Sequence, residues 1–309
     1  MEGSQLQGQR ISLQRSHQFS RLRGEQPLFV LNGPLMKPMI LQPLIPDWKN
    51  KLIAFCQRRP TNWLGRRLAL LGRKLVMKGL PVPVEAQVEG IKVKLHLHDN
   101  ICERRFLFMP QFFDQEERAI ISERLPADGV FVDIGANVGL YSLRAAQALG
   151  GNGTILAFEP NPVTFERLKT NVSMNEIKAT VILEQLGIGE GEGELELVLH
   201  PDNLGEASAF AEFGGEKISV PSHSLNQVLD LHSIEKIDVL KIDIEGFEDV
   251  ALMPFLRSDS SARFPNTIVI EKSEDRWRSD LLGQLLSLGY RHSISTKNNH
   301  VLFLGSESH

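Results

Sequence analysis

Cysteines and long apolar runs are scarce in this chain, and each scarcity excludes a class of protein. The 309 residues include two cysteines, Cys56 and Cys102, which are too few and too far apart for a disulfide framework or a structural zinc site. No apolar run approaches the roughly 18 residues of a membrane span. The N-terminus, rich in Gln, Arg and Ser, lacks the apolar core of a secretory signal. We therefore expect a protein of a reducing compartment, the cytoplasm.

Acidic residues are scarce in the first quarter of the chain. Residues 1–80 contain 14 basic and 3 acidic residues, whereas residues 81–309 contain 20 and 35, so the two parts have net charges of +11 and −15. A basic arm on an acidic body indicates contact with an anionic surface or with the body itself. The apolar fraction of 42% is sufficient for a large core.

The rest of the chain is organised around one stretch of sequence. Val130–Ile134 predicts a buried strand, Gly135 to Gly139 a tight turn, and residues 140–149 a helix. Such a turn presents free backbone N–H groups to a ligand at the start of the helix. The spacing Asp133-x-Gly-x-Asn-x-Gly differs from the G-x-G-x-x-G of dinucleotide-binding proteins. A carboxylate at this point favours a cationic ligand, such as the ammonium and sulfonium groups of S-adenosylmethionine (SAM).

Further acids stand at the ends of later predicted strands. Glu159 follows the next strand, where an acid can accept hydrogen bonds from ribose hydroxyls. Because the carboxyl ends of parallel strands meet at one edge of a sheet, several acids should share one rim. These acids are Asp133, Glu159, Asp243, Glu245 and Glu271. The alternative interpretation for the strand around Lys241 is a structural lysine–acid pair.

Strands and helices alternate along most of the chain, which indicates an α/β fold with a mostly parallel sheet and helices on both faces. The last two strands, 290–295 and 301–304, are predicted to form an antiparallel hairpin. Strands are also predicted at 195–199 and 217–220, and residues 81–113 are predicted to form a β element. Asp114, Asn161 and Ser224 are predicted to cap helices. We divide the chain into a disordered or extended arm, a basic amphipathic helical segment, a small β hairpin and helix leading into the core, and a ligand-binding domain. Their bounds are 1–47, 48–80, 81–125 and 126–309.

The basic segment combines charge with a helical apolar row. Residues 48–80 contain nine basic residues and no acid, and Pro60 divides them into two predicted helices. The row consists of Leu64, Leu68, Leu71 and Leu75. We favour its packing on the acidic body as an N-terminal cap, because most such rows face a core. Peripheral contact with an anionic membrane is the second interpretation. No nucleic acid is expected, since no recognition motif accompanies the charge.

Three blocks of sequence occur in the order found in a known family. They are Val132-Asp133-Ile134-Gly135-Ala136-Asn137-Val138-Gly139, Phe158-Glu159-Pro160 and Leu240-Lys241-Ile242-Asp243-Ile244-Glu245-Gly246. From about Leu95 to Ser295 the chain therefore resembles the FkbM family of SAM-dependent methyltransferases. The resemblance implies a Rossmann-like sheet of the class I methyltransferases. It also implies that Asp243 lies near the reacting methyl group. Where the family often has an acidic pair, this chain has Ser224-Leu225-Asn226-Gln227.

The resemblance implies O-methylation of a hydroxyl on a sugar, a glycolipid or a secondary metabolite, so the partner is a small-molecule or glycan acceptor. Asp243 is the first candidate for the base that takes the hydroxyl proton, with Glu245 and Glu271 in reserve. The predicted cofactor-binding residues are Asp133, Gly135, Ala136, Asn137, Gly139, Glu159, Pro160, Asn161 and Asp243. No metal ligand is predicted, although several rim acids can instead hold a divalent cation.

Two other functions fit parts of the pattern. One is a nucleotide-dependent oxidoreductase, against which the acid at Asp133 and the glycine spacing both argue. The other is a non-catalytic protein that uses the same fold to bind an adenosine cofactor.

Overall fold

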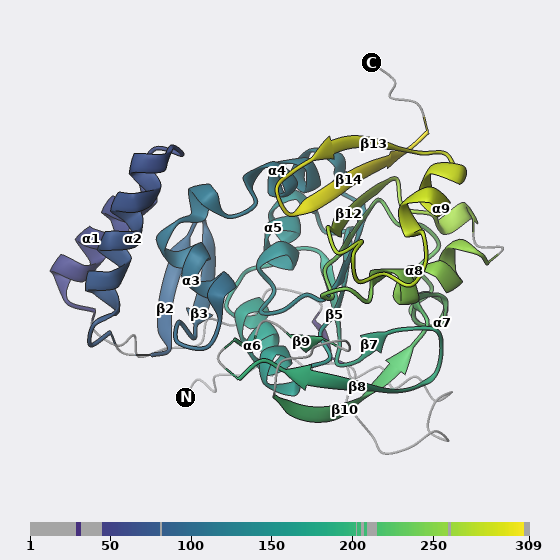
Figure 1. The fold of residues 1–309 in the computed structure, drawn as a ribbon, viewed down its shortest axis with the longest axis horizontal. Helices are drawn as coiled ribbons and strands as arrows, with labels where there is room; N and C mark the ends of the chain where they lie inside the picture. Colours follow the sequence, from purple (N-terminus) through teal and green to yellow (C-terminus); the bar gives the residue numbers. More distant parts are fainter. Residues whose placement is uncertain are drawn as a thin grey trace, which may run out of the picture.

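The computed structural model describes residues 29–31, 45–80, 82–201, 203–204, 207–208, 215–258 and 261–305. Its centre is an eight-stranded sheet with helices on both faces, which confirms the predicted α/β class (Figure 1). Most of the predicted arm, residues 1–28 and 32–44, lies outside the described part. No described helix has both the length and the apolar character that crossing a membrane requires.

The central sheet has the strand order β1-β6-β5-β4-β11-β12-β14-β13. Its five inner strands, from β6 to β12, run parallel, whereas β14 is antiparallel to both of its neighbours. The predicted closing hairpin is thereby confirmed. The strand bounds are β1 Phe29–Leu31, β4 Val130–Ile134, β5 Thr154–Phe158, β6 Thr180–Glu184, β11 Val239–Ile242, β12 Thr267–Glu271, β13 Tyr290–Ser295 and β14 Asn299–Leu304.

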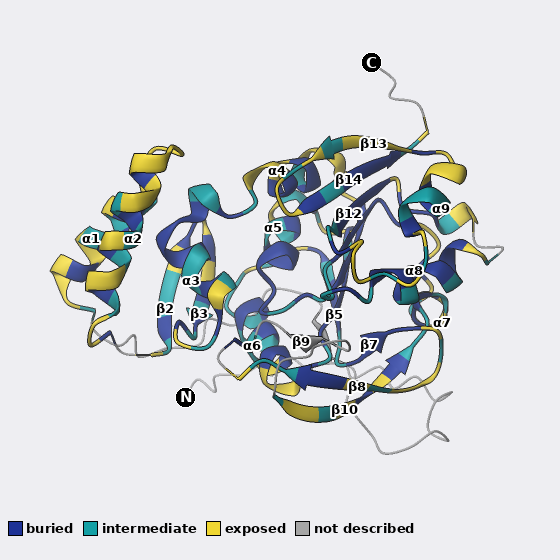
Figure 2. Cartoon of the chain, in the orientation of Figure 1, coloured by how far each residue is buried: buried dark blue, intermediate teal, exposed yellow. Residues whose placement is uncertain are grey.

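Helices cover the two faces of this sheet because successive strand residues point to opposite sides. Phe131 joins the core beneath α4, α5 and α6, while Val132 joins the core beneath α7, α8 and α9. Figure 2 shows the central strands buried between these layers. The helix bounds are α4 Gln115–Arg124, α5 Leu140–Ala148, α6 Pro162–Ser173, α7 Leu225–Leu231, α8 Glu248–Leu256 and α9 Leu281–Ser287.

A second, four-stranded sheet is inserted between β6 and α7, with the order β7-β10-β8-β9. Its bounds are β7 Gly187–Ile188, β8 Gly193–Leu199, β9 Ala207–Ser208 and β10 Glu216–His223. The strands at β8 and β10 are predicted from the sequence, but their assembly into a separate sheet is not. The predicted cap of α7 is confirmed, since the Ser224 hydroxyl accepts a hydrogen bond from the Gln227 N–H.

The segment before the core contains one helix that the sequence did not predict. The predicted hairpin forms from β2 (Val84–Val88) and β3 (Ile91–Leu95). The residues after it, expected to remain part of a β element, form helix α3 (Ile101–Phe108) and a 3-10 turn, η1 (Pro110–Phe112). The α3 helix begins there because the Asn100 side chain accepts a hydrogen bond from the Glu103 N–H.

The basic segment forms two helices, α1 (Asp47–Gln57) and α2 (Trp63–Met77), divided near Pro60 as predicted. The face that α2 buries is made of small residues, with Gly65, Ala69, Gly72 and Val76 facing inward. The expectation that the leucine row packs on the body is wrong, because Leu64, Leu71 and Leu75 are each more than half exposed. The pair is fixed to the body through α1 instead, since the Gln57 side chain donates a hydrogen bond to the Leu107 carbonyl.

The orientation of α2 can be tested by substitution on its two faces. A Cβ on Gly72 would lie 2.4 Å from the Cys56 sulfur, so Gly72→Val should lower the free energy of unfolding by about 1–3 kcal/mol through overpacking. The neighbouring exposed change Leu71→Ala should alter it by no more than about 0.5 kcal/mol. Urea unfolding measures both. A larger loss for Leu71→Ala than for Gly72→Val would contradict this packing.

Candidate active site

The turn between β4 and α5 packs directly against the segment that follows β11. Gly135, Asn137 and Gly139 have positive φ angles of 79°, 51° and 86°. A Cβ on Gly135 would lie 2.1 Å from the carbonyl oxygen of Asp243, so only glycine fits there. The Asp243 N–H also donates a hydrogen bond to the Ile134 carbonyl. The two motifs, about a hundred residues apart in the sequence, are therefore in backbone contact.

The backbone N–H groups of this turn are not free for a ligand, which corrects the expectation from the sequence. Gly135 and Ala136 both donate to the Phe158 carbonyl, and Gly139 donates to the Ala136 carbonyl. Asn137 and Val138 donate to side-chain oxygens. All five groups are satisfied within the chain, so recognition of a ligand at this turn falls to side chains.

Glu159 connects this turn to the next helix. Its two carboxylate oxygens accept hydrogen bonds of 2.9 Å from the N–H groups of Asn137 and Asn161. Burial raises the pKa of Glu159 to about 7, against the effect of these two hydrogen bonds. Asn161 is fully buried and caps α6, as predicted, by accepting a hydrogen bond from the Val163 N–H. Asn161 therefore fixes the loop that carries Glu159.

A buried lysine occupies the centre of the site. The ammonium of Lys241 lies 3.2 Å from an Asp243 carboxylate oxygen and 3.8 Å from one of Asp133. It also donates a hydrogen bond to the Gly135 carbonyl and stands 4.9 Å from the centre of the Tyr141 ring. The lysine–acid pair considered from the sequence is thus present, and it contains both aspartates.

Asp133 lies beneath the rim and not on it, contrary to the expectation from the sequence. It is fully buried, and in the sheet register it stands opposite Lys241. Burial raises the pKa of Asp133, while Lys241 and the Ser142 hydroxyl lower it. One Asp133 oxygen accepts the Ser142 hydrogen bond of 2.6 Å, and the other has no hydrogen-bond partner among the described residues. That second oxygen lies 3.8 Å from the Lys241 ammonium, so an ion pair offsets its charge although no hydrogen bond satisfies it.

The charge of Lys241 is set by its two carboxylate neighbours. Burial alone would lower the pKa of this lysine, but Asp243 and Asp133 outweigh burial and raise it. Lys241 is therefore a cation at neutral pH. It offsets the charge of the buried aspartate and holds the partly exposed Asp243 carboxylate in one direction.

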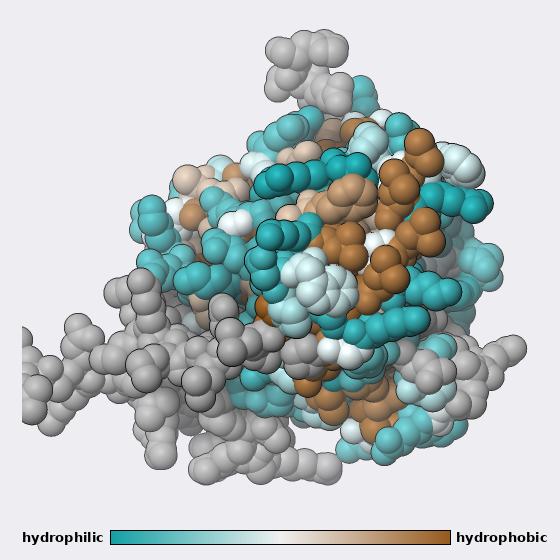
Figure 3. Space-filling view, turned by 90° about the vertical axis from the view of Figure 1, so that its left-hand side faces the viewer, coloured by the Kyte–Doolittle hydropathy of each residue, from teal (hydrophilic) through white to brown (hydrophobic). Residues whose placement is uncertain are grey.

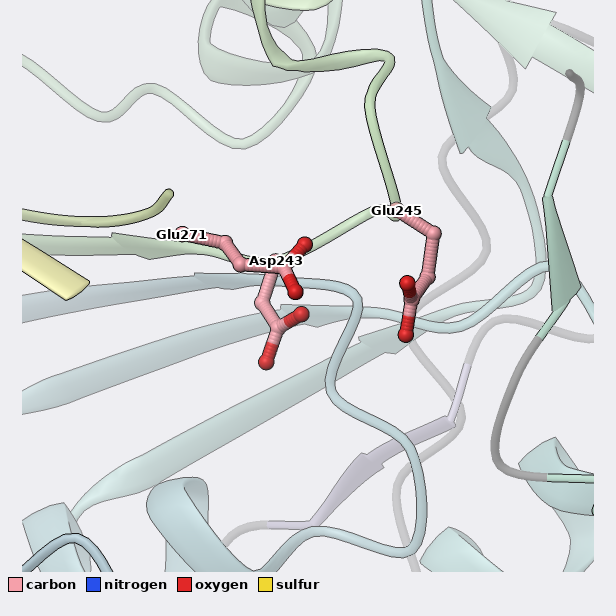
Figure 4. A group of neighbouring side chains, drawn as sticks. All are labelled: Asp243, Glu245 and Glu271. Carbon is pink, nitrogen blue, oxygen red and sulfur yellow. The ribbon is translucent and has the colours of Figure 1, made fainter. Parts of the chain in front are cut away.

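Three acids lie together at the carboxyl ends of the parallel strands. Asp243 and Glu245 follow β11, Glu271 ends the adjacent strand β12, and one carboxylate oxygen from each lies within 4.8 Å of the others (Figure 4). Burial and the neighbouring carboxylates raise the pKa of Glu271 to about 9. A set of three carboxylate oxygens can hold a divalent cation, and a cation would relieve their repulsion. The metal-dependent interpretation therefore stays open beside the metal-free one.

An apolar pocket, partly open to solvent, lies beside the turn. Of the predicted cofactor residues, Gly135 and Pro160 line this pocket, and the remaining seven do not. The second sheet supplies one wall through Leu195 and Leu197, which sequence reasoning did not assign to a site. Their strand was predicted, but its position over the pocket depends on the assembly of the inserted sheet.

A second polar group near Asp243 was also missed. The Tyr141 hydroxyl donates a hydrogen bond of 3.1 Å to Asp114, whose other oxygen lies 3.6 Å from the Arg105 guanidinium. Asp114 was predicted to cap α4, but its φ is 42° and its side chain makes no capping bond. Burial raises the pKa of Asp114, and Asp243 contributes to the rise. The position of Tyr141, directly after the glycine turn, is the sequence feature from which this group could have been predicted.

Comparison with protein families matches residues 133–292, about half of the chain, to the Methyltransferase FkbM domain. The chain is 31% identical over 154 residues to "Methyltransferase sdnD" of Sordaria araneosa, which covers 40% of this chain and 59% of the relative. It is 26% identical to "Hexuronic acid methyltransferase AglP" of Haloferax volcanii, covering 49% and 60%. It is 28% identical to "31-O-demethyl-FK506 methyltransferase FkbM" of Streptomyces tacrolimicus, covering 49% and 68%. The chain thus spans about three fifths of the first two relatives.

The charge balance around Lys241 gives a prediction for stability. Lys241→Met leaves Asp133 buried without its cation, which should lower the free energy of unfolding by about 3–5 kcal/mol. Adding Asp133→Asn should recover part of the loss, because the uncompensated charge is then gone. Denaturant unfolding measures both variants.

The matched control is Lys217→Met, in an exposed pair with Glu196. It should change the free energy of unfolding by no more than about 0.5 kcal/mol. If the double variant were less stable than Lys241→Met alone, the interaction between Lys241 and Asp133 would not be the dominant one.

Proposed function

The chain belongs to the FkbM family of methyltransferases, and on this basis we propose that it methylates a hydroxyl group of a sugar, a glycolipid or a secondary metabolite. Membership confirms the resemblance predicted from the sequence, together with the methyltransferase class of the domain and its cofactor, SAM. The observation that supports the proposed reaction most is the cluster of Asp133, Lys241 and Asp243, where the two motifs meet. Membership also disfavours the nucleotide-dependent oxidoreductase.

The residues beside the turn fit this cofactor. The apolar pocket suits an adenine ring, and the Glu159 carboxylate stands at the end of the neighbouring strand, where ribose hydroxyls can donate to it. Asp133 is suited to act beneath this ligand rather than in direct contact with it, because its second oxygen already pairs with Lys241. When bound, SAM supplies a methyl group that its sulfonium has already activated. The chain itself must therefore align the acceptor and remove one proton.

We assign the removal of the proton to Asp243. A general base must be ionised before it reacts. The Lys241 ammonium lies 3.2 Å from the Asp243 carboxylate and holds it in place at the rim, whereas Glu271, with a pKa raised to about 9, holds its proton at neutral pH. The Asp243 carboxylate accepts the acceptor's hydroxyl proton as the oxygen–methyl bond forms. Glu271 and Glu245 remain the reserve candidates, since their carboxylates lie beside that of Asp243.

A hydroxyl acceptor is supported by the names of two relatives. One is a hexuronic acid methyltransferase, and the other acts on a 31-O-demethyl compound. The partner proposed for this chain is accordingly a small molecule or a glycan with a free hydroxyl. The start of α7 differs from the family's usual pattern at Ser224-Leu225-Asn226-Gln227, so the acceptor need not be that of either relative.

The assignment of the base is tested by Asp243→Asn. The amide keeps the shape but cannot accept the proton, so the rate of methyl transfer should fall about 10²- to 10⁴-fold. Transfer of a labelled methyl group to a panel of hexuronic acids and hydroxylated macrolides measures this rate. Affinity for S-adenosylhomocysteine, measured by calorimetry, should change by only a few-fold.

Asp230→Asn, the same change at an exposed acid on α7, is the control and should keep the wild-type rate. Activity should also survive EDTA without added metal. A wild-type rate of methyl transfer in Asp243→Asn would show that Asp243 is not the base. Loss of activity in EDTA with recovery in Mg²⁺ would assign the three acids to a cation instead.

The raised pKa of Glu159 predicts how cofactor binding depends on pH. With a pKa of about 7, the carboxylate that accepts the ribose hydroxyls is mostly ionised at pH 8 and mostly protonated at pH 6. The affinity for S-adenosylhomocysteine should therefore be about tenfold weaker at pH 6. Glu159→Gln should bind weakly at both pH values.

Glu103 provides the matched control, because burial also raises its pKa to about 7. Glu103→Gln should keep the pH dependence of binding. If Glu159→Gln showed the full dependence and Glu103→Gln lost it, the ribose assignment would be wrong.

A further inference from the structure

One end of the molecule presents an apolar surface. Eleven large hydrophobic side chains are exposed among the described residues, and six of them lie on α1 and α2. These six, which we call the end patch, are Trp48, Phe55, Trp63, Leu64, Leu71 and Leu75. Figure 3 faces this end and shows hydrophobic side chains in a band between hydrophilic ones. Gathered apolar side chains mark an interaction surface, whereas singly scattered ones are ordinary.

The end patch does not pack on the body of the protein, because α1 and α2 pack through other residues. The small face of α2 lies against α1, where Leu52 and Cys56 fill the space beside Gly72. Lys49 on α1 donates a hydrogen bond to the Lys78 carbonyl. With the Gln57 contact to α3, these bonds hold the helix pair in place, so the end patch faces outward.

Basic side chains border the leucines of the end patch. Arg67 and Lys74 each lie one helical turn from Leu71, and Lys78 lies one turn from Leu75. Residues 45–80 contain nine basic residues and one acid. That acid, Asp47, pairs with Lys51 on α1 and so leaves the charge beside α2 uncompensated among the described residues. This surface therefore attracts an anionic partner.

Aromatic residues stand near the start of both helices. Trp63 begins α2, is 70% exposed, and has its ring centre 4.8 Å from the Arg67 guanidinium. Trp48 is the second residue of α1 and is also exposed. Tryptophan favours the boundary between acyl chains and headgroups, because its ring is apolar and its N–H is polar. The combination of leucines, tryptophans and a basic border is typical of helices that lie in a membrane interface.

We propose that the end patch docks on an anionic lipid bilayer. The leucines and aromatic rings enter the boundary of the acyl chains, while Arg67, Lys74 and Lys78 contact lipid phosphates. The two helices form the outermost layer at this end of the molecule, which suits a broad lipid surface (Figure 1). Docking does not depend on the identity of the methyl acceptor, so it can hold or fail independently of the proposed reaction.

Vesicle flotation of the full-length protein tests the proposal. The wild-type chain should float with vesicles of phosphatidylcholine and phosphatidylglycerol and bind vesicles of phosphatidylcholine alone much more weakly. Leu71→Gln/Leu75→Gln should bind the anionic vesicles at least about tenfold more weakly, because two side chains no longer leave water. Arg67→Gln/Lys74→Gln/Lys78→Gln should also bind more weakly and lose most of the salt dependence.

The matched control is Leu286→Gln on α9, since Leu286 is 53% exposed and Leu75 is 55% exposed. It should bind as the wild type does, and thermal melts should show that every variant is folded. Failure of the wild-type chain to bind anionic vesicles would overturn the proposal. A dimer that Leu71→Gln/Leu75→Gln converts to a monomer, with no binding to vesicles, would instead assign the end patch to a second copy.

Discussion

One buried cation joins the two halves of this site. Lys241 lies between the fully buried Asp133 and the partly exposed Asp243, and it donates a hydrogen bond to the carbonyl of Gly135. Because an isolated buried charge is very costly, neither Asp133 nor Lys241 could occupy its strand without the other. The absence of a Cβ at Gly135 then lets the Asp243 backbone come close enough to complete the cluster. The spacing of both motifs follows from this contact.

The chemistry of the rim follows from the same arrangement. Lys241 forms an ion pair with Asp243, the one acid that it contacts at the surface, whereas burial and acidic neighbours raise the pKa of Glu271. Two acids of the same rim thus have different environments. Gly135 and Ile244 line the apolar pocket, so the proposed adenine site lies next to Asp243, the proposed proton acceptor.

Much of the fold and part of the site were predictable from the sequence, because strand ends and glycine turns are determined by residues close to them in the chain. The fold class, the closing hairpin and the caps at Asn161 and Ser224 are determined by nearby residues. Three features depend on tertiary contacts and were not predictable: the burial of Asp133, the outward direction of the leucine row, and the inserted sheet over the pocket. The prediction that the leucine row faces the body was wrong because α2 packs more closely through its small residues than it could through leucines. The role of Asp114 was mistaken because a cap and a buried acceptor look alike in sequence.

A crystal structure of the full chain with bound S-adenosylhomocysteine would show whether the two motifs form one cofactor site. The adenine should lie in the apolar pocket, the ribose hydroxyls on Glu159, and the sulfur toward the space in front of Asp243, with Lys241 still between the two aspartates. A ligand bound elsewhere, or a Lys241 that has left Asp243 to contact the ligand, would contradict this arrangement.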